Sequence, residues 1–97
     1  MPQRRVAVAA AEGLHARPAA IFVKAAAATG VPVTVGRPDG PTADARSILA
    51  VLSLDVRHGD EVVLSADGPG AEEALDRLAA LLAGETVHSV QTGDGSG

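Results

Sequence analysis

The sequence predicts one α+β domain in which a mostly antiparallel sheet carries helices on one face. Three observations support this fold class. Short stretches have apolar residues at alternate positions, as strands do, one alanine-rich run has helical composition, and a later run is amphipathic at helical spacing. These segments follow one another in the order βαββαβα, within a chain of 97 residues that fits a single domain.

The first elements follow from alternation, alanine content and the positions of glycine. The stretch RRVAVAA (4–10) is short, has β-branched valines at alternate positions and precedes a Glu-Gly turn, so we expect a strand. The next run (16–29) is expected to be helical because alanine is the best helix former, and Gly30 stands where a C-terminal cap belongs. VPVTVG (31–36) alternates again, with its proline near the start, where a strand loses least from a missing donor.

The later elements depend on a turn motif and two further changes of period. The turn sequence RPDGP (37–41) predicts a hairpin that leads into a short strand near 42–43. A short helix is expected over 47–54, where apolar residues have helical spacing. EVVLSA (61–66) is expected to form a strand, and 71–83 a helix with leucines on one side and charged residues on the other.

Composition argues against several functional classes. The chain has no cysteine, which removes disulfides and thiolate metal sites, and its formal net charge of −4 disfavours a general nucleic-acid binder. Apolar runs stay well below the roughly 18 residues of a membrane span, and no signal peptide is evident, so we expect a cytoplasmic protein without membrane insertion. Phe22 is the one aromatic residue, and we expect neither a cofactor nor a metal.

No internal repeat or second domain is evident in the chain. We expect residues 1–86 to form the domain. The C-terminal stretch ETVHSVQTGDGSG lacks sustained hydrophobic periodicity, so 87–97 is predicted to be a flexible tail, to which the sequence assigns no role.

A histidine stands at the start of the first predicted helix. The first amides of a helix lack intrahelical partners, and the helix dipole puts about half a positive charge there, which favours an uncharged imidazole with a nucleophilic lone pair. With a phosphoryl group on His15, the backbone amides of Ala16 and Arg17 and the Arg17 guanidinium can hold its oxygens. Pro18 fits the first turn without loss. On these residues alone, a capping or surface role for His15 stays open.

Two motifs extend this interpretation. GLHARPAAIFV (13–23) resembles the active-site signature of the HPr family, the phosphocarrier proteins of the phosphoenolpyruvate-dependent sugar phosphotransferase system. ARSILAVLSLD (45–55) resembles the serine signature of the same family, and the element order matches over most of the chain. The resemblance implies an open-faced β-sandwich, with a four-stranded antiparallel sheet and three helices on one face.

The resemblance also implies a reaction. His15 would take a phosphoryl group on Nδ1 from phosphorylated enzyme I, whose donor is phosphoenolpyruvate, and pass it to a histidine of a sugar-specific enzyme IIA domain. Arg17 would support the phosphoryl group in both transfers. The protein would be a stoichiometric carrier, expected to be a monomer, and not an enzyme that turns over a substrate alone.

Ser47 aligns with the family's regulatory serine. In some bacterial lineages an ATP-dependent kinase, the HPr kinase/phosphorylase, phosphorylates that residue. Independently of any kinase, Ser47 is expected to cap the short helix, a contribution of about 1 kcal/mol. A phosphate at this cap is expected to act by repelling acidic partners and not by unfolding the helix.

The resemblance further implies a surface that meets enzyme I and enzyme IIA. An apolar centre inside a charged rim suits a transient interface. The expected centre consists of Ile21, Ile48, Leu49 and Leu52, and the expected basic rim of Arg17, Lys24 and Arg46. A position of Ile48 and Leu52 in the core is the competing interpretation.

Other functions remain to be weighed. A specialised relative in a nitrogen-regulatory phosphotransfer chain, or the donor to a dihydroxyacetone kinase, would keep His15 and Arg17, although the serine motif favours the carbon branch. A regulatory binding domain of this architecture would be expected to lack the histidine. An independent enzyme is least favoured, because the sequence has no paired carboxylates in a defined pocket, metal-ligand spacing or nucleotide-binding loop.

Overall fold

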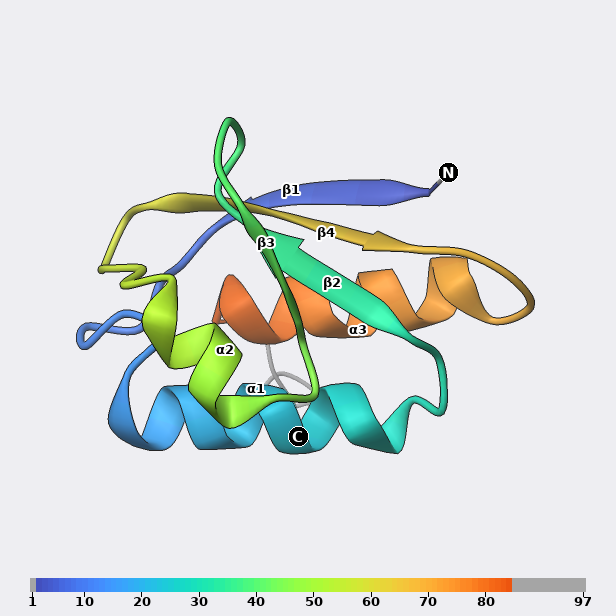
Figure 1. Ribbon diagram of the computed structural model, residues 1–97, viewed down its shortest axis with the longest axis horizontal. Coiled ribbons are helices and arrows are strands. Elements are labelled where there is room, and N and C mark those ends of the chain that lie inside the picture. Colours follow the sequence, from blue (N-terminus) through green and yellow to red (C-terminus); the bar gives the residue numbers. More distant parts are fainter. Residues whose placement is uncertain (1, 85–97) are drawn as a thin grey trace, which may run out of the picture.

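The computed structural model describes residues 2–84, which form four strands and three helices in the order βαββαβα (Figure 1). The strands are β1 (Gln3–Ala7), β2 (Val33–Gly36), β3 (Thr42–Asp44) and β4 (Glu61–Ala66). The helices are α1 (Ala16–Ala28), α2 (Ile48–Ser53) and α3 (Ala71–Leu82). The predicted tail at 87–97 and the last two residues of the predicted domain lie outside the described residues.

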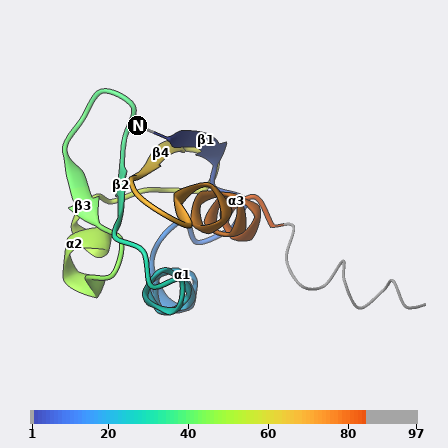
Figure 2. The same cartoon turned by 90° about the vertical axis from the view of Figure 1, so that its right-hand side faces the viewer.

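The four strands form one sheet in the order β1-β4-β2-β3, and all three pairings are antiparallel. Register pairs Arg5 with Val63 between β1 and β4, and Thr34 with Ser65 between β2 and β4. The three helices lie on one side of this sheet and leave its other face open (Figures 1 and 2). The structure therefore confirms the predicted open-faced sheet with three helices on one face.

The core fills the space between the sheet and the helices. Alternate residues of β4 are buried, namely Val62, Leu64 and Ala66, which gives the period of two expected for a strand with one face covered. Phe22 of α1 is fully buried among the smaller side chains that make up the rest of the core. Ala19 is buried as well, and α1 packs against α2 and α3.

The first strand is shorter than predicted. The pattern at 4–10 predicted a strand through Ala10, but β1 ends at Ala7. The N–H of Ala9 donates to the carbonyl oxygen of Leu82, the last residue of α3, at 2.9 Å. The chain has therefore left the sheet and turned toward the helices, which a run of alternating apolar residues cannot reveal. The other predicted bounds are off by no more than two residues, mainly because cap residues were counted as helix.

Ser47 is the N-cap of α2, and its Oγ accepts a hydrogen bond from the N–H of Ala50 at 3.3 Å. We expect Ser47→Ala to lower the free energy of unfolding by about 1 kcal/mol, because the first turn of α2 then loses this acceptor. Urea denaturation measures the change. Ser47→Asn, which keeps a good capping side chain, should stay close to the parent, and an equal loss in both variants would contradict the capping role.

Candidate functional site

His15 is the N-cap residue of α1, with an extended backbone (φ −131°, ψ 165°). Its side chain makes no capping hydrogen bond, so the imidazole is not engaged by the helix start that follows it. The side chain is 38% exposed, which leaves the ring accessible to a partner molecule. The ring is neither sealed in the core nor fully surrounded by solvent.

The amides after His15 are available to a ligand. Ala16 and Arg17 occupy the first two helical positions, whose N–H groups have no intrahelical acceptor, and Pro18 has no N–H at all. The first amide that bonds back to His15 is that of Ala19, at 3.4 Å from the His15 carbonyl oxygen. The Arg17 side chain is exposed and makes no ion pair within residues 2–84. This arrangement of donors suits an oxyanion.

Ala16 has a left-handed backbone conformation, with φ +49°. A residue with a Cβ pays about 1–2 kcal/mol for that region, so the surrounding structure must hold it in place. Both flanks are fixed, because Leu14 is buried on one side and Ala19 on the other. Strain of this kind, kept by its surroundings, is often found where a backbone positions a functional group. Sequence reasoning did not anticipate it, since alanine gives no signal for a positive φ.

The loop that carries His15 is joined to the segment after α2. The N–H of Leu14 donates to the carbonyl oxygen of Val56 at 2.9 Å. Gly13, with φ +71°, lies so close to the same segment that a Cβ would stand 2.3 Å from that oxygen. Only glycine permits this approach, and it fixes the end of α2 beside the start of α1 (Figure 1).

This junction places Asp55 next to His15. Asp55 follows the C-cap of α2 with φ +52°, and its Oδ1 is 3.4 Å from His15 Nε2. Sequence reasoning missed this residue. An aspartate directly after a predicted helix was a signal for a residue in the left-handed conformation at the helix end. That this helix end lies beside His15 depends on tertiary contacts, which the local sequence does not reveal.

Two arginines surround the same helix end. Arg57 Nη2 donates to Asp55 Oδ2 at 3.2 Å. Arg37, from the start of the β2–β3 hairpin loop, donates to the carbonyl oxygen of Leu54 at 3.3 Å, to that of Asp55 at 2.6 Å and to Asp60 Oδ2 at 3.1 Å. A cation at these carbonyls also complements the negative end of the α2 dipole.

Asp60 gives this region a pH dependence. The backbone N–H of Arg57 and the side chain of Arg37 donate to its carboxylate and hold the pKa of Asp60 below its ordinary value. A lowered pKa means that the folded state binds this proton less tightly than the unfolded state. The carboxylate therefore stabilises the fold above its unfolded-state pKa, and this contribution disappears as the pH falls through the lower folded-state value.

We expect Asp60→Asn to be less stable than the parent near neutral pH and equally stable in strong acid, because only the ionised carboxylate is lost. Denaturation at a series of pH values between about 2 and 7 measures the difference. Asp39→Asn, on the exposed hairpin loop, is the control. A difference between Asp60→Asn and the parent that stays constant with pH would contradict the argument.

The apolar residues expected to contact partners differ in their exposure to solvent. Ile21, Ile48 and Leu49 are exposed, with Leu49 at 78%. Leu52 is half-buried and packs against the core, so the core interpretation holds for this residue in part. The core interpretation does not hold for Ile48, which is 38% exposed.

The basic residues of the expected rim lie in two separate places. Arg17 and Lys24 are seven positions apart on α1, with Ile21 between them, so all three share one exposed helix face. Arg46 lies elsewhere: it precedes the N-terminal end of α2, whereas His15 neighbours the C-terminal end, about 9 Å away along a helix of this length.

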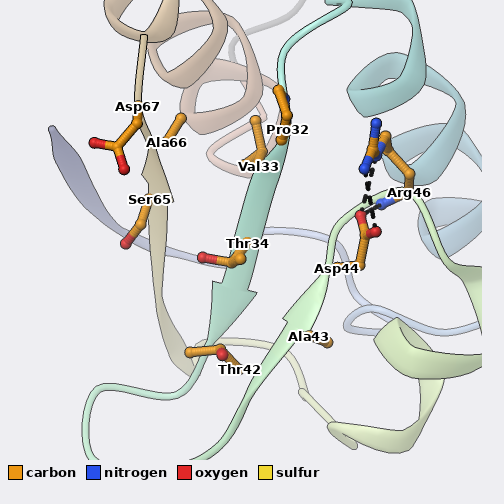
Figure 3. Close-up of a pocket in the computed structure, with 10 residues that line it drawn as sticks. All are labelled: Pro32, Val33, Thr34, Thr42, Ala43, Asp44, Arg46, Ser65, Ala66 and Asp67. Atoms are coloured by element: carbon orange, nitrogen blue, oxygen red, sulfur yellow. Dashed lines mark hydrogen bonds and ion pairs between the residues drawn. The ribbon is translucent and has the colours of Figure 1, made fainter. Parts of the chain in front are cut away.

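Arg46 lines a pocket on the sheet together with residues of β2, β3 and β4 (Figure 3). Its guanidinium donates to both carboxylate oxygens of Asp44, at 3.2 and 3.4 Å. This contact lowers the pKa of the Asp44 carboxyl. His15 does not line this pocket.

Within residues 2–84 no three His, Cys, Asp or Glu side chains are grouped as metal ligands. In the same part of the chain no helix is both long and apolar enough to cross a bilayer.

His58 is exposed, and its Nδ1 is 3.2 Å from the carbonyl oxygen of Ala10.

Comparison with known proteins gives consistent matches. A family model described as "PTS HPr component phosphorylation site" matches residues 2–84. The phosphocarrier protein HPr of Streptomyces coelicolor is 60% identical over 83 residues, which cover 86% of this chain and 89% of the relative. The phosphocarrier protein HPr of Vibrio cholerae is 42% identical over 82 residues, covering 84% and 95%. The crystal structure of HPr from Bacillus anthracis matches with a TM-score of 0.79 and 40% identity, over 84% of this chain and 95% of that one.

Proposed function

Because the chain belongs to the HPr family, the phosphocarrier proteins of the phosphotransferase system, we propose that it relays a phosphoryl group from phosphorylated enzyme I to enzyme IIA domains. Phosphoenolpyruvate charges enzyme I in this scheme. The observation that carries the proposal is the position of His15, a half-exposed N-cap residue followed by two free backbone amides. Such a protein is a carrier that must be recharged after each transfer.

The proposed chemistry uses His15 and the donors that follow it at the start of α1. The lone pair of His15 Nδ1 attacks phosphorus, the bond from phosphorus to the donor breaks, and the electron pair of that bond stays with the donor. The phosphoryl oxygens then accept hydrogen bonds from the amides of Ala16 and Arg17 and from the Arg17 guanidinium. An exposed charge at a helix start gains only about 0.3–1 kcal/mol, so the group is held and can still leave.

Docking would use the exposed faces of α1 and α2 next to His15. Ile21 on α1 and Ile48 and Leu49 on α2 provide exposed apolar side chains on two helices that pack against each other, with Leu52 at their edge. Arg17 and Lys24 supply positive charge on α1, and Arg46 supplies it at the far end of α2. This surface suits partners with an apolar patch ringed by acidic residues.

Regulation would act through Ser47. A cytoplasmic ATP-dependent serine kinase of the HPr kinase/phosphorylase type would place a phosphate at the start of α2, inside the proposed docking surface of a monomeric carrier. The added negative charge would repel acidic partners while the helix start accommodates it. Incubation with such a kinase and ATP, followed by a test of phosphoryl uptake from enzyme I, would show a slower uptake; an unchanged rate would remove the regulatory role.

The relay is tested by incubating the protein with enzyme I and phosphoenolpyruvate. We expect the intact mass to increase by one phosphoryl group, the modification to be lost in acid, and peptide mapping to place it on His15. Addition of an enzyme IIA domain should then return the original mass. An unchanged mass with active enzyme I, or a phosphoryl group on another residue, would refute the proposal.

Arg17→Ala is expected to slow phosphoryl uptake by about 10- to 100-fold, because a charge-assisted hydrogen bond to the transferred group contributes about 1.5–3 kcal/mol. Stability should hardly change, since the Arg17 side chain is exposed. Single-turnover kinetics with phosphorylated enzyme I measures the rate. Lys24→Ala, on the same helix face, removes an equal charge farther from His15 and serves as the control, and equal rates in the two variants would exclude a specific role for Arg17.

A further inference from the structure

One carboxylate lies beside Nε2 of the imidazole, the ring nitrogen that does not take the phosphoryl group in the proposed relay. Asp55 Oδ1 lies 3.4 Å from His15 Nε2, while Asp55 Oδ2 accepts from Arg57 Nη2 at 3.2 Å. The three side chains therefore form a row, His15–Asp55–Arg57. An aspartate that faces one ring nitrogen determines which nitrogen carries the proton, and the other nitrogen is then the one with the lone pair.

The backbone holds Asp55 at this place through several independent contacts. Its N–H donates to the carbonyl oxygen of Leu52 at 3.1 Å, and its own carbonyl oxygen accepts from Arg37 at 2.6 Å. The next residue, Val56, is bonded to the His15 loop through Leu14. The two interacting side chains thus stand on segments that are joined by main-chain contacts.

The conformation of Asp55 argues that its side chain has a use. With φ +52° it occupies the left-handed position after a helix, where glycine is the residue with the lowest conformational cost. Any residue with a Cβ is strained in that conformation. Asp55 is 60% exposed, and its exposed ion pair with Arg57 contributes little stability in return.

We propose that Asp55 is a positioning residue for phosphoryl transfer at His15, a role that rests on the proposed function. Its carboxylate keeps the ring proton on Nε2, so that the lone pair resides on Nδ1, the nitrogen that takes the phosphoryl group in the proposed relay. When the bond from Nδ1 to phosphorus forms, the ring gains a positive charge while the Nε2 proton stays in place. The carboxylate lies beside that proton and stabilises the charge, and Arg57 keeps the carboxylate oriented.

The test compares Asp55→Asn and Asp55→Gly with the parent. Asparagine keeps the shape and tolerates the left-handed conformation, and glycine removes the side chain at a position that favours it. We expect both variants to load more slowly, by about tenfold, in single turnovers at saturating phosphorylated enzyme I, because a nearby opposite charge favours the charged ring by about this factor or more. We expect Asp55→Gly to melt at the same temperature as the parent or at a higher one, which separates positioning from stability.

A spectroscopic reading in the free protein supplements the rates. The ¹⁵N shifts of the His15 ring should show the proton mainly on Nε2 in the parent and a shift toward the other tautomer in both variants. Asp44→Asn is the matched control, because Asp44 is also an exposed carboxylate paired with an arginine. Asp44 is the last residue of β3 and precedes the N-terminal end of α2, whereas His15 neighbours the C-terminal end. Asp44→Asn should leave both readings unchanged.

The possible outcomes separate this role from the proposed function. If the variants and the parent load at equal rates, or if the ring tautomer is unchanged, the role of Asp55 is refuted and the relay stands. If the variants are slow only below saturation, Asp55 serves docking and the positioning role is refuted as well. If the parent itself takes no phosphoryl group, the relay is refuted and the role of Asp55 with it.

Discussion

Replacing His15 by alanine is expected to abolish phosphoryl uptake from enzyme I while the free energy of unfolding changes by no more than about 0.5 kcal/mol. Activity is lost because the nucleophilic nitrogen is removed. Stability is kept because the imidazole makes no capping hydrogen bond and is partly exposed, so alanine leaves neither an unpaired donor nor a cavity. Intact-mass measurement after incubation with enzyme I and phosphoenolpyruvate reads the first effect, and urea denaturation reads the second.

His58→Ala is the matched control for this experiment. Within residues 2–84, His58 is the second histidine, and it is exposed. In that part of the chain its ring lies within hydrogen-bond distance of one group, the carbonyl oxygen of Ala10. This variant should load one phosphoryl group as the parent does. Uptake of a phosphoryl group by His15→Ala, or loss of uptake in His58→Ala, would show that His15 is not the acceptor.

Gly13→Ala is expected to lower the free energy of unfolding by about 2–5 kcal/mol. About 1–2 kcal/mol comes from placing a Cβ at φ +71°, and overpacking adds about 1–3 kcal/mol. The new Cβ would stand 2.3 Å from the Val56 carbonyl oxygen and 2.6 Å from the Arg57 Cα, and neither backbone atom can rotate away. Because the same contact joins His15 to the end of α2, the surviving folded fraction should also load more slowly.

Gly30→Ala isolates the backbone part of this cost. Gly30 has φ +72°, almost the same conformation, but no atom lies within 4 Å of the position of its Cβ. We therefore expect only the conformational penalty of about 1–2 kcal/mol and a normal rate of loading. Equal losses of stability in the two variants would show that the approach of Gly13 to Val56 is less tight than described.

The element order could be predicted from the sequence because local patterns determine it. Strands with one covered face alternate, as β4 does, and an alanine-rich run between glycines forms a helix, as α1 does. The end of β1 could not be predicted, since Ala9 turns toward Leu82, a partner more than seventy positions away. Local pattern carries no information on such a contact.

The candidate site was predictable in part for the same reason. His15, Arg17 and the two amides belong to one local motif at one helix start, and Ser47 is a local cap. Asp55 comes from a distant segment, and its place beside His15 depends on Gly13 and on Arg37. Arg46 shows the reverse case, because its sequence position next to Ser47 suggested the rim of the site, whereas its side chain pairs with Asp44 on the sheet.

One wall of the site is a helix of only six residues. A segment this short does not persist by its own propensity and depends on the Ser47 cap, on Arg37 and on packing against α1 and β3. Local opening of such a unit requires less free energy than melting of the sheet. Warming should therefore slow phosphoryl uptake from enzyme I at temperatures below the melting temperature of the domain, because α2 opens before the core does.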